Sequence, residues 1–299
     1  MSLGGSAQAA ANRRGIVAMS AAMAAFIIND ALIKIVSRSL PAGQMIFVRG
    51  LVVAVLILAV AHATGATARL GDLARRRVAL RGIIDASATT LYLASLVHLP
   101  IANATAINLA APLFMTLFAM LFMNERVGWT GWLAVVAGFA GVLLVIQPRA
   151  AGFNAWALVC LAATLLHAVR DLMTRRIAAG VPSILIALAS AIAACVIAGV
   201  YAVAEGWQPV GAVEAALLCA AAVAVATGYF LIIASFRMGD VAVIAPFRYS
   251  ALLFALLLGY FVWGDVPNVL AWCGISLVIG AGLYVIIAER RRASAATPP

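Results

Sequence analysis

The sequence predicts an all-α integral membrane protein with ten transmembrane helices, arranged as two inverted five-helix repeats around a central cavity. Three observations predict this fold. The 299-residue chain is 66% hydrophobic and only 10% charged, whereas a soluble domain carries about 25% charged residues. Apolar runs of about 20 residues, the length that crosses a bilayer, recur along the chain. The two halves of the chain also match each other at a nearly constant offset.

The apolar runs set the expected positions of the helices. We expect spans at residues 16–36, 43–61, 79–98, 101–122, 129–147, 154–174, 184–204, 213–236, 241–262 and 269–288. Barrel strands would alternate in polarity over about ten residues, so each run is expected to be a helix that satisfies its own backbone. The first run is too long, and too polar at its end, for a cleaved signal peptide. The longer connections run from His62 to Leu80 and from Gly206 to Ala212.

The chain contains an internal duplication, with a first repeat at residues 1–148 and a second at residues 149–299. Shifts of 140 or 141 positions align charged and aromatic residues in the same order: Asp30 with Asp171, Lys34 with Arg175, and Trp132 with Trp272. Chance matching among many alanines, leucines and valines would rarely order such residues. Five spans per repeat make the second repeat cross the bilayer in the opposite direction. Such duplication in an apolar chain is typical of transporters.

The arginines indicate how the chain is oriented. With the N-terminus inside, the inner connections collect Arg13, Arg14, Arg69, Arg75, Arg76, Arg77, Arg126, Arg175, Arg176, Arg237 and Arg290 to Arg292. The outer connections keep little beyond Arg38 and Arg149. Because basic residues concentrate on the cytoplasmic side, both termini are expected in the cytoplasm. The net charge of +10 therefore reflects membrane topology and does not predict a nucleic-acid partner.

Metal, cofactor and enzyme chemistry are not expected. The cysteines lie singly within apolar runs, without the spacing of a zinc site or a disulfide framework: Cys160, Cys195, Cys219 and Cys273. The histidines are too far apart in sequence for a metalloprotease helix. The sequence shows neither a phosphate-binding glycine loop nor a nucleophile elbow. It also lacks the rings of like residues or the repeated filter segment that a channel would show.

Several motifs resemble a known family. Residues 101–108 read IANATAIN, Pro112-Leu113 follow, and Asn124-Glu125-Arg126 close the segment. These motifs, with the glycine-rich run at 138–144, resemble the EamA-type repeat of the drug/metabolite transporter superfamily. The second copy, from Met238 to Asp265, is similar but has Asp265 in place of the usual glutamate and no proline matching Pro112. Within the superfamily the chain looks most like bacterial amino-acid exporters, including the aromatic amino-acid type.

The resemblance implies a fold, a location and a transport direction. It implies a cavity open to one side at a time, net efflux across the inner membrane, and peripheral fifth and tenth helices. The sequence supports the peripheral role, because small residues four apart, as at Ala137 and Gly141 or Ser276 and Gly280, let helices approach closely. We expect these helices to act as a scaffold or as the surface of a weak homodimer; a monomer is the other expectation.

Three acids inside predicted spans each lie one turn from a base. The pairs are Asp30 with Lys34, Asp171 with Arg175, and Asp85 with Arg81. A charge within a span costs about 2.5–3.5 kcal/mol, so each needs a partner or a purpose. One interpretation is local neutralisation near a membrane face. A second is a gate, in which the Asp30 pair at the outer end and the Asp171 pair at the inner end close alternately. A third is proton coupling through Asp30.

Arg248 differs from these charges because no acid lies three or four positions away. It falls about 10 Å into its predicted helix at 1.5 Å per residue. Its guanidinium suits a substrate carboxylate, and a structural pairing with an acid on another helix is the alternative. The equivalent position of the first repeat is Asn108, also polar and also expected midway along a helix. A central site shared by both repeats would use two such positions.

Other polar residues are weaker candidates for the cavity. His167 is either a satisfied core group or a proton carrier. The polar tips of five more residues could line the cavity or bond neighbouring helices: Asn29, Asn103, Tyr92, Tyr229 and Tyr249. Pro112 and Pro246 would free backbone carbonyls midway along helices and bend them at the cavity.

The sequence therefore predicts a carrier that works by alternating access. We expect a secondary transporter that exports amino acids, aromatic and other neutral ones, or related small metabolites across the bacterial inner membrane. A broad-specificity drug or metabolite efflux carrier and an exchanger of nucleotide-sugar type are the alternatives. A channel or an intramembrane enzyme fits less well. The expected partners are a small-molecule substrate and membrane lipid.

Overall fold

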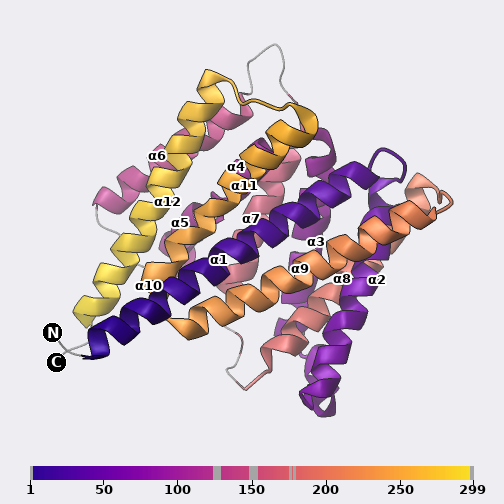
Figure 1. The fold of residues 1–299 in the computed structure, drawn as a ribbon, viewed down its shortest axis with the longest axis horizontal. Coiled ribbons are helices and arrows are strands. Elements are labelled where there is room, and N and C mark those ends of the chain that lie inside the picture. Colours follow the sequence, from indigo (N-terminus) through magenta and orange to yellow (C-terminus); the bar gives the residue numbers. More distant parts are fainter. Residues whose placement is uncertain (1–2, 124–128, 148–153, 175–176, 178–179, 297–299) are drawn as a thin grey trace. The chain divides into compact units, whose positions relative to one another are not determined.

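The computed structural model describes residues 3–123, 129–147, 154–174, 177 and 180–296. The described part is helical and contains no strand. In the first repeat its elements are α1 (Leu3–Val36), α2 (Ala42–Ala63), the 3₁₀ helix η1 (Ala66–Ala74), α3 (Arg76–His98), α4 (Ile101–Asn108), α5 (Ala111–Met123) and α6 (Trp129–Ile146). In the second they are α7 (Trp156–Thr174), α8 (Ser183–Glu205), α9 (Ala212–Met238), α10 (Val241–Ile244), η2 (Ala245–Tyr249), α11 (Ser250–Leu258), η3 (Gly259–Trp263) and α12 (Val269–Ala296) (Figure 1).

The helices agree with the predicted membrane spans. Seven segments of the described chain are long and apolar enough to cross a bilayer, and Trp132–Ile146 and Val269–Val285 are shorter apolar helices. The remaining predicted span, 79–98, lies in α3, which is less apolar because it carries Arg76, Arg77, Arg81 and Asp85. The protein is therefore an all-helical, two-repeat membrane protein, consistent with ten helices.

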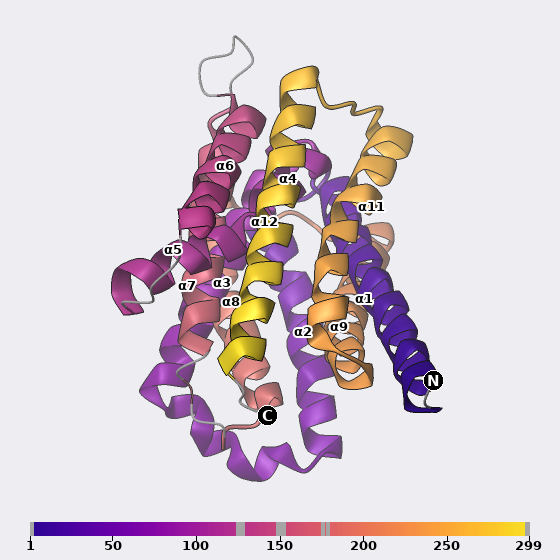
Figure 2. The same cartoon turned by 90° about the vertical axis from the view of Figure 1, so that its left-hand side faces the viewer.

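Two of the predicted spans are not single helices. The predicted helix 101–122 is divided into α4 and α5 by a turn at Leu109 and Ala110 (Figure 2). The predicted helix 241–262 is divided into α10, η2, α11 and η3. Proline, which cannot donate a backbone hydrogen bond within a helix, accounts for one break in each span. Pro112 follows the first break, and Pro246 lies inside η2.

The chain forms two compact units, and each takes segments from both repeats. Unit 1 comprises Met1–Ile28, Pro100–Phe153 and Thr227–Pro299, and unit 2 comprises Asn29–Leu99 and Asn154–Ala226. The helices α1 and α9 contribute residues to both units. The compact units therefore do not follow the boundary between the repeats at residue 148.

In unit 1, α6 packs closely along α12 (Figure 1). Two glycines allow this approach. A Cβ atom on Gly141 would lie 2.7 Å from the carbonyl oxygen of Gly274, and one on Gly274 would lie 2.5 Å from the carbonyl oxygen of Gly141. Any larger side chain would push the two backbones apart. Small residues at helix interfaces are the usual way for membrane helices to gain van der Waals contact.

In unit 2, α2 packs against α8, and α3 packs against α7 and α8. Polar contacts hold the connection that follows α8 against the start of α2. The Gly43 N–H donates to Glu205 Oε2 at 2.6 Å. Gln44 Nε2 donates to the Gln208 carbonyl at 2.7 Å, and Gln44 Oε1 accepts from the Gln208 N–H at 2.9 Å. These bonds satisfy backbone groups that a helix end would otherwise leave unpaired.

The close approach of α6 and α12 predicts a stability difference between two glycines. Gly141→Leu is expected to lower the midpoint of thermal unfolding in detergent by several degrees, since overpacking costs about 1–3 kcal/mol. Gly280→Leu, on α12, is the matched control because nothing lies within 4 Å of a Cβ atom built there. Equal losses in the two variants would show that the contact between Gly141 and Gly274 does not hold the helices together.

Candidate functional site

The two interrupted spans lie in unit 1 and correspond to each other in the two repeats. A shift of 140 places residues 101–108 on residues 241–248. The first helical piece ends at Asn108 in one repeat, and Arg248 lies in the 3₁₀ turn η2 in the other. The helix α4 packs against α11. Breaks at matching positions of two repeats are typical of transporter binding sites, where unwound backbone faces the substrate path.

Several buried polar atoms on these interrupted segments lack a hydrogen-bond partner within the described residues. They are Asn103 Oδ1, Thr105 Oγ1, Tyr249 Oη and Ser250 Oγ. The Tyr249 hydroxyl lies directly against Gly282 of α12, where no Cβ atom would fit. An unsatisfied buried polar group calls for an explanation such as a bound water or ligand. The interrupted segments therefore hold buried polar atoms that call for a bound water or solute.

Arg248 is exposed on the interrupted segment. It belongs to the apolar stretch Ala245–Trp263, which is long enough to cross a membrane. The helix at this point is not the continuous one that the sequence predicted, so Arg248 lies in a 3₁₀ turn and Asn108 at a helix end. Tyr229 is also in unit 1, exposed on α9, and its ring meets Phe26 edge-on with 5.2 Å between ring centres.

Unit 2 contains a buried polar network around Asp30. The Asp30 carboxylate accepts hydrogen bonds from Asn29 Nδ2 at 2.9 Å and from the Tyr92 hydroxyl at 2.8 Å. Asn29 Oδ1 in turn accepts from Arg49 at 2.9 Å. Lys34, the predicted partner of Asp30, donates to the Leu99 carbonyl. The network joins α1, α2 and α3 through side-chain hydrogen bonds.

A second network in unit 2 joins α3, α7 and α8. Asp85 lies 3.0 Å from Arg81 and 2.7 Å from Arg170. Arg170 also lies 2.9 Å from Asp171. Arg81 extends the network to Ser190 at 2.5 Å and to Thr174 at 3.2 Å. Arg175, the predicted partner of Asp171, lies outside the described residues.

The sequence interpretation missed two arginines in these networks. Arg49 lies about seven residues into an apolar span. A charge at that depth is costly, so its position alone indicated that Arg49 has a buried partner or a function. Arg170 directly precedes Asp171. It pairs with Asp85, which lies on another helix and 85 positions earlier in the sequence. Local spacing, which reveals pairs three or four residues apart, does not reveal such a contact. His167 lies near both networks, with its ring centre 6.3 Å from that of Tyr92.

The predicted site residues thus fall into two groups. Unit 1 holds Arg248, Asn108, Asn103, Tyr249 and Tyr229, and unit 2 holds Asn29, Asp30, Lys34, Asp85, Tyr92, His167 and Asp171. Within the described residues no three His, Cys, Asp or Glu side chains come together as metal ligands. In unit 2 the polar side chains pair mainly with one another.

The Asp85 network generates a prediction about stability. Asp85→Asn is expected to cost about 3–5 kcal/mol, because the largely buried guanidinium of Arg81 would lose its carboxylate partner and Arg170 would keep only Asp171. Their side chains are 14% and 18% exposed. Asp72→Asn is the matched control, since Asp72 also bridges two arginines, Arg69 and Arg75, whose side chains are 46% and 54% exposed. That change is expected to cost at most about 1 kcal/mol.

The measurement is the free energy of unfolding of the purified variants in detergent. A loss in Asp85→Asn no greater than that in Asp72→Asn would contradict a stabilising role for the buried network.

Comparison with known proteins identifies the family. A model of the EamA-like transporter family matches residues 13–147 and again residues 154–288. The S-adenosylmethionine uptake transporter of Rickettsia bellii is 28% identical over 215 residues, which cover 72% of this chain and 74% of that protein. The riboflavin transporter of Rhizobium johnstonii is 31% identical over 213 residues, covering 71% of this chain and 70% of that protein.

A third relative matches almost the whole chain. The pseudopaline exporter CntI of Pseudomonas aeruginosa is 25% identical over 285 residues, covering 92% of this chain and 94% of the exporter. A solved crystal structure of a 17% identical protein shares the fold, with a TM-score of 0.62 over 92% of this chain and 98% of that one. The family match falls once on each repeat and together covers most of the sequence. The protein belongs to the EamA-like transporter family and is a transporter of small metabolites.

Proposed function

We propose that this protein is a secondary carrier that exports a small metabolite with a carboxylate group, such as an amino acid or a compound with an amino-acid end. The observation that carries the proposal is the pair of matching breaks in unit 1, with Asn108 at one and Arg248 at the other. Buried polar atoms without hydrogen-bond partners among the described residues, on both interrupted segments, support hydrogen bonding to a polar solute.

Arg248 supports a carboxylate as part of the substrate. An exposed arginine that faced lipid at mid-span would cost about 2.5–3.5 kcal/mol or more. We therefore place its side chain in a water-filled path, where a planar guanidinium can bind a carboxylate through two parallel hydrogen bonds. Tyr249 beside it is buried with its hydroxyl against Gly282 of α12, so Arg248 is the exposed member of this pair.

The relatives guide the choice of substrate class. S-adenosylmethionine has an amino-acid end joined to an adenine-bearing group, so a carboxylate contact would serve it as well as a free amino acid. Riboflavin has a planar ring system and no carboxylate, so a contact with Arg248 would contribute less to its binding. Export of aromatic and other neutral amino acids is the narrower form of our proposal. The pseudopaline exporter, which matches 92% of the chain, supports the outward direction, whereas the S-adenosylmethionine relative is an uptake transporter.

We further propose that the carrier works by alternating access, with both termini in the cytoplasm. The buried networks around Asp30 and Asp85 each close within unit 2. This supports a role in keeping unit 2 intact while the protein changes conformation. The gate formed by Asp30 and Asp171, and proton coupling through Asp30, stay predictions.

The proposed function is tested by flux into proteoliposomes. The panel contains S-adenosylmethionine, riboflavin, and aromatic, aliphatic and hydroxylated amino acids, each with and without a pH gradient. A carrier is expected to show a saturable rate that unlabelled substrate on the opposite side stimulates. Flux that rises linearly with concentration and voltage would indicate a channel instead.

Arg248→Gln is expected to lower the affinity for carboxylate-bearing substrates by about tenfold or more, since charged hydrogen bonds contribute about 1.5–3 kcal/mol. Riboflavin, which has no carboxylate, should be unaffected if it is carried. Arg237→Gln is the matched control because Arg237 lies exposed in the last turn of α9 and carries the same charge. Native affinity in Arg248→Gln would remove Arg248 from the binding site.

Topology is tested separately. Green fluorescent protein fused to the C-terminus is expected to fluoresce in cells, and alkaline phosphatase fused at the same point is expected to be inactive, because both termini are proposed to be cytoplasmic. The opposite pair of results would reject the orientation deduced from the arginines.

A further inference from the structure

Unit 2 contains a cavity that the proposed transport site does not use. Its volume is about 270 Å³, close to the lower end of the range for small-molecule sites, which begins at about 300 Å³. The lining residues lie at helix ends and connections: Ser37 follows α1, Met45 begins α2, His98 ends α3, Trp156 begins α7, and Tyr201 and Glu205 end α8. Such a volume suits a ligand about the size of an amino acid.

One wall of the cavity is aromatic. The rings of His98 and Trp156 stack with 4.1 Å between centres and an angle of 15° between planes. Asn154 supports this wall, since its Nδ2 donates to the His98 carbonyl at 2.7 Å and its Oδ1 accepts from the Trp156 N–H at 3.0 Å. Both residues are therefore held in place before any ligand binds. The face of an indole ring is the best aromatic surface for a cation.

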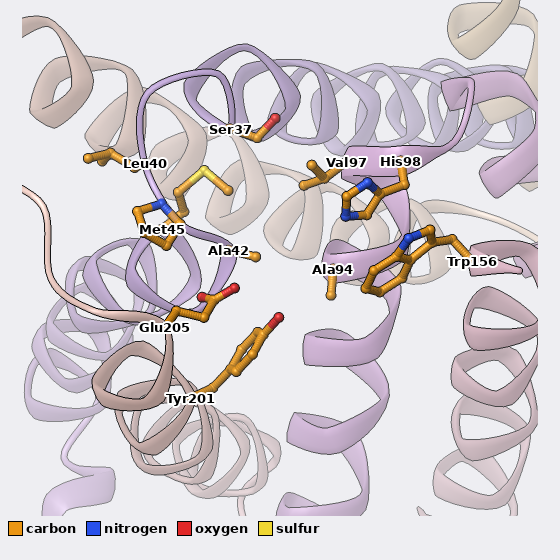
Figure 3. Close-up of a pocket in the computed structure, with 11 residues that line it drawn as sticks. Ser37, Leu40, Ala42, Met45, Ala94, Val97, His98, Trp156, Tyr201 and Glu205 are labelled. Atoms are coloured by element: carbon orange, nitrogen blue, oxygen red, sulfur yellow. The ribbon is translucent and has the colours of Figure 1, made fainter. Parts of the chain in front are cut away.

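The opposite wall carries a carboxylate. Figure 3 shows Glu205 and Tyr201 across the cavity from His98 and Trp156, with the Tyr201 hydroxyl directed toward Glu205. Glu205 Oε2 accepts from the Gly43 N–H, which positions the carboxylate at the cavity wall. Among the described residues no lysine, arginine or histidine forms an ion pair with Glu205.

The charges around the cavity favour a cation. The residues that line it include one carboxylate and, among the described residues, no lysine or arginine. Lys34, on the turn before Ser37, donates to the Leu99 carbonyl and does not line the cavity. An aromatic face opposite a carboxylate is the usual arrangement for recognising an organic ammonium or sulfonium group.

We propose that this cavity is a second binding site, which takes the positively charged group of an organic cation about the size of an amino acid. The cation would lie on the side of the Trp156 ring that His98 does not cover, toward the Glu205 carboxylate. By the predicted topology, the connections that line the cavity are on the outer side. The site would therefore meet solutes there, independently of the residues at the breaks of unit 1.

The simpler explanation is that Glu205 only caps the start of α2 through Gly43. Glu205→Gln separates the two roles, because the amide oxygen can still accept from the Gly43 N–H while the charge is lost. Glu214→Gln is the matched control, since Glu214 lies in the first turn of α9, on the next connection, and does not line the cavity.

The probes are choline and 3,3-dimethyl-1-butanol, which have nearly the same shape and differ in charge. Binding to the purified full chain in a non-ionic detergent is measured by titration calorimetry at pH 8, where an ordinary imidazole is neutral. The wild-type protein is expected to prefer choline by about fivefold or more, since cation–π contacts contribute about 0.5–2 kcal/mol. Glu205→Gln is expected to abolish the preference and Glu214→Gln to retain it.

A second pair of variants tests the aromatic wall. Trp156→Leu should weaken choline binding more than Trp156→Phe, which keeps a ring. Trp207→Leu is the control because Trp207 contacts Phe47 at 6.1 Å between ring centres and does not line the cavity. All variants are checked for unchanged unfolding midpoints.

The results distinguish this inference from the proposed function. Equal binding of the two probes by wild-type protein, or a choline preference that survives in Glu205→Gln, would overturn the cation site. A protein that prefers choline as expected but moves none of the panel across proteoliposomes would retain the cation site and reject the proposed transport function.

Discussion

A hydrocarbon bilayer offers no hydrogen-bond partner, and this constraint accounts for most of the polar structure of the protein. Every backbone group and charge within a span must be satisfied inside the protein or face water. Helices satisfy the backbone. The acids of unit 2 are satisfied within the protein: Asp85 pairs with Arg81 and Arg170, and Asp30 accepts hydrogen bonds from Asn29 and Tyr92. Where the helices of unit 1 are broken, polar atoms are left without partners among the described residues, which is the feature expected of a solute path.

The compact units form across the repeats because equivalent helices pack together. The second span of each repeat forms the pair α2 and α8, and the fifth span of each forms the pair α6 and α12. The fourth and ninth spans likewise meet through α4 and α11. Each pair joins one helix from each repeat, so neither repeat is compact by itself. Small residues decide how closely a pair can approach, as Gly141 and Gly274 do for α6 and α12.

The two proposed binding sites use different chemistry. The breaks in unit 1 combine an exposed guanidinium with unsatisfied hydroxyl and amide oxygens, which suits a carboxylate and neutral polar groups. The cavity in unit 2 combines a stacked indole with a carboxylate, which suits a cation. A solute with an amino-acid end carries groups that match both. The two sites are made of residues from separate units, so each can be altered without touching the other.

The sequence by itself determined the class of the protein and the positions of its helices. Long apolar runs, few charges and a duplicated order of residues require membrane spans, because no other structure could bury so much apolar surface. Pro112 and Pro246 also indicated the breaks, since proline removes a helical donor wherever it stands. The arginine at position 248 was visible because a charge within an apolar run is costly in any fold.

The tertiary structure alone decided which polar groups meet. Arg49 contacts Asn29 across 20 positions of sequence, and Arg170 contacts Asp85 across 85. Helical periodicity predicts only contacts between residues three or four positions apart, so it does not predict these two. The local pair expected of Asp30 and Lys34 shows the same limit. Tyr92, on another helix, donates a hydrogen bond to Asp30, and Lys34 donates to the carbonyl of Leu99. The cavity lined by Trp156 and Glu205 likewise exists only because the ends of α3, α7 and α8 come together with the start of α2. Contacts between helices depend on packing, and packing depends on the shapes of whole surfaces that a linear order of residues does not specify.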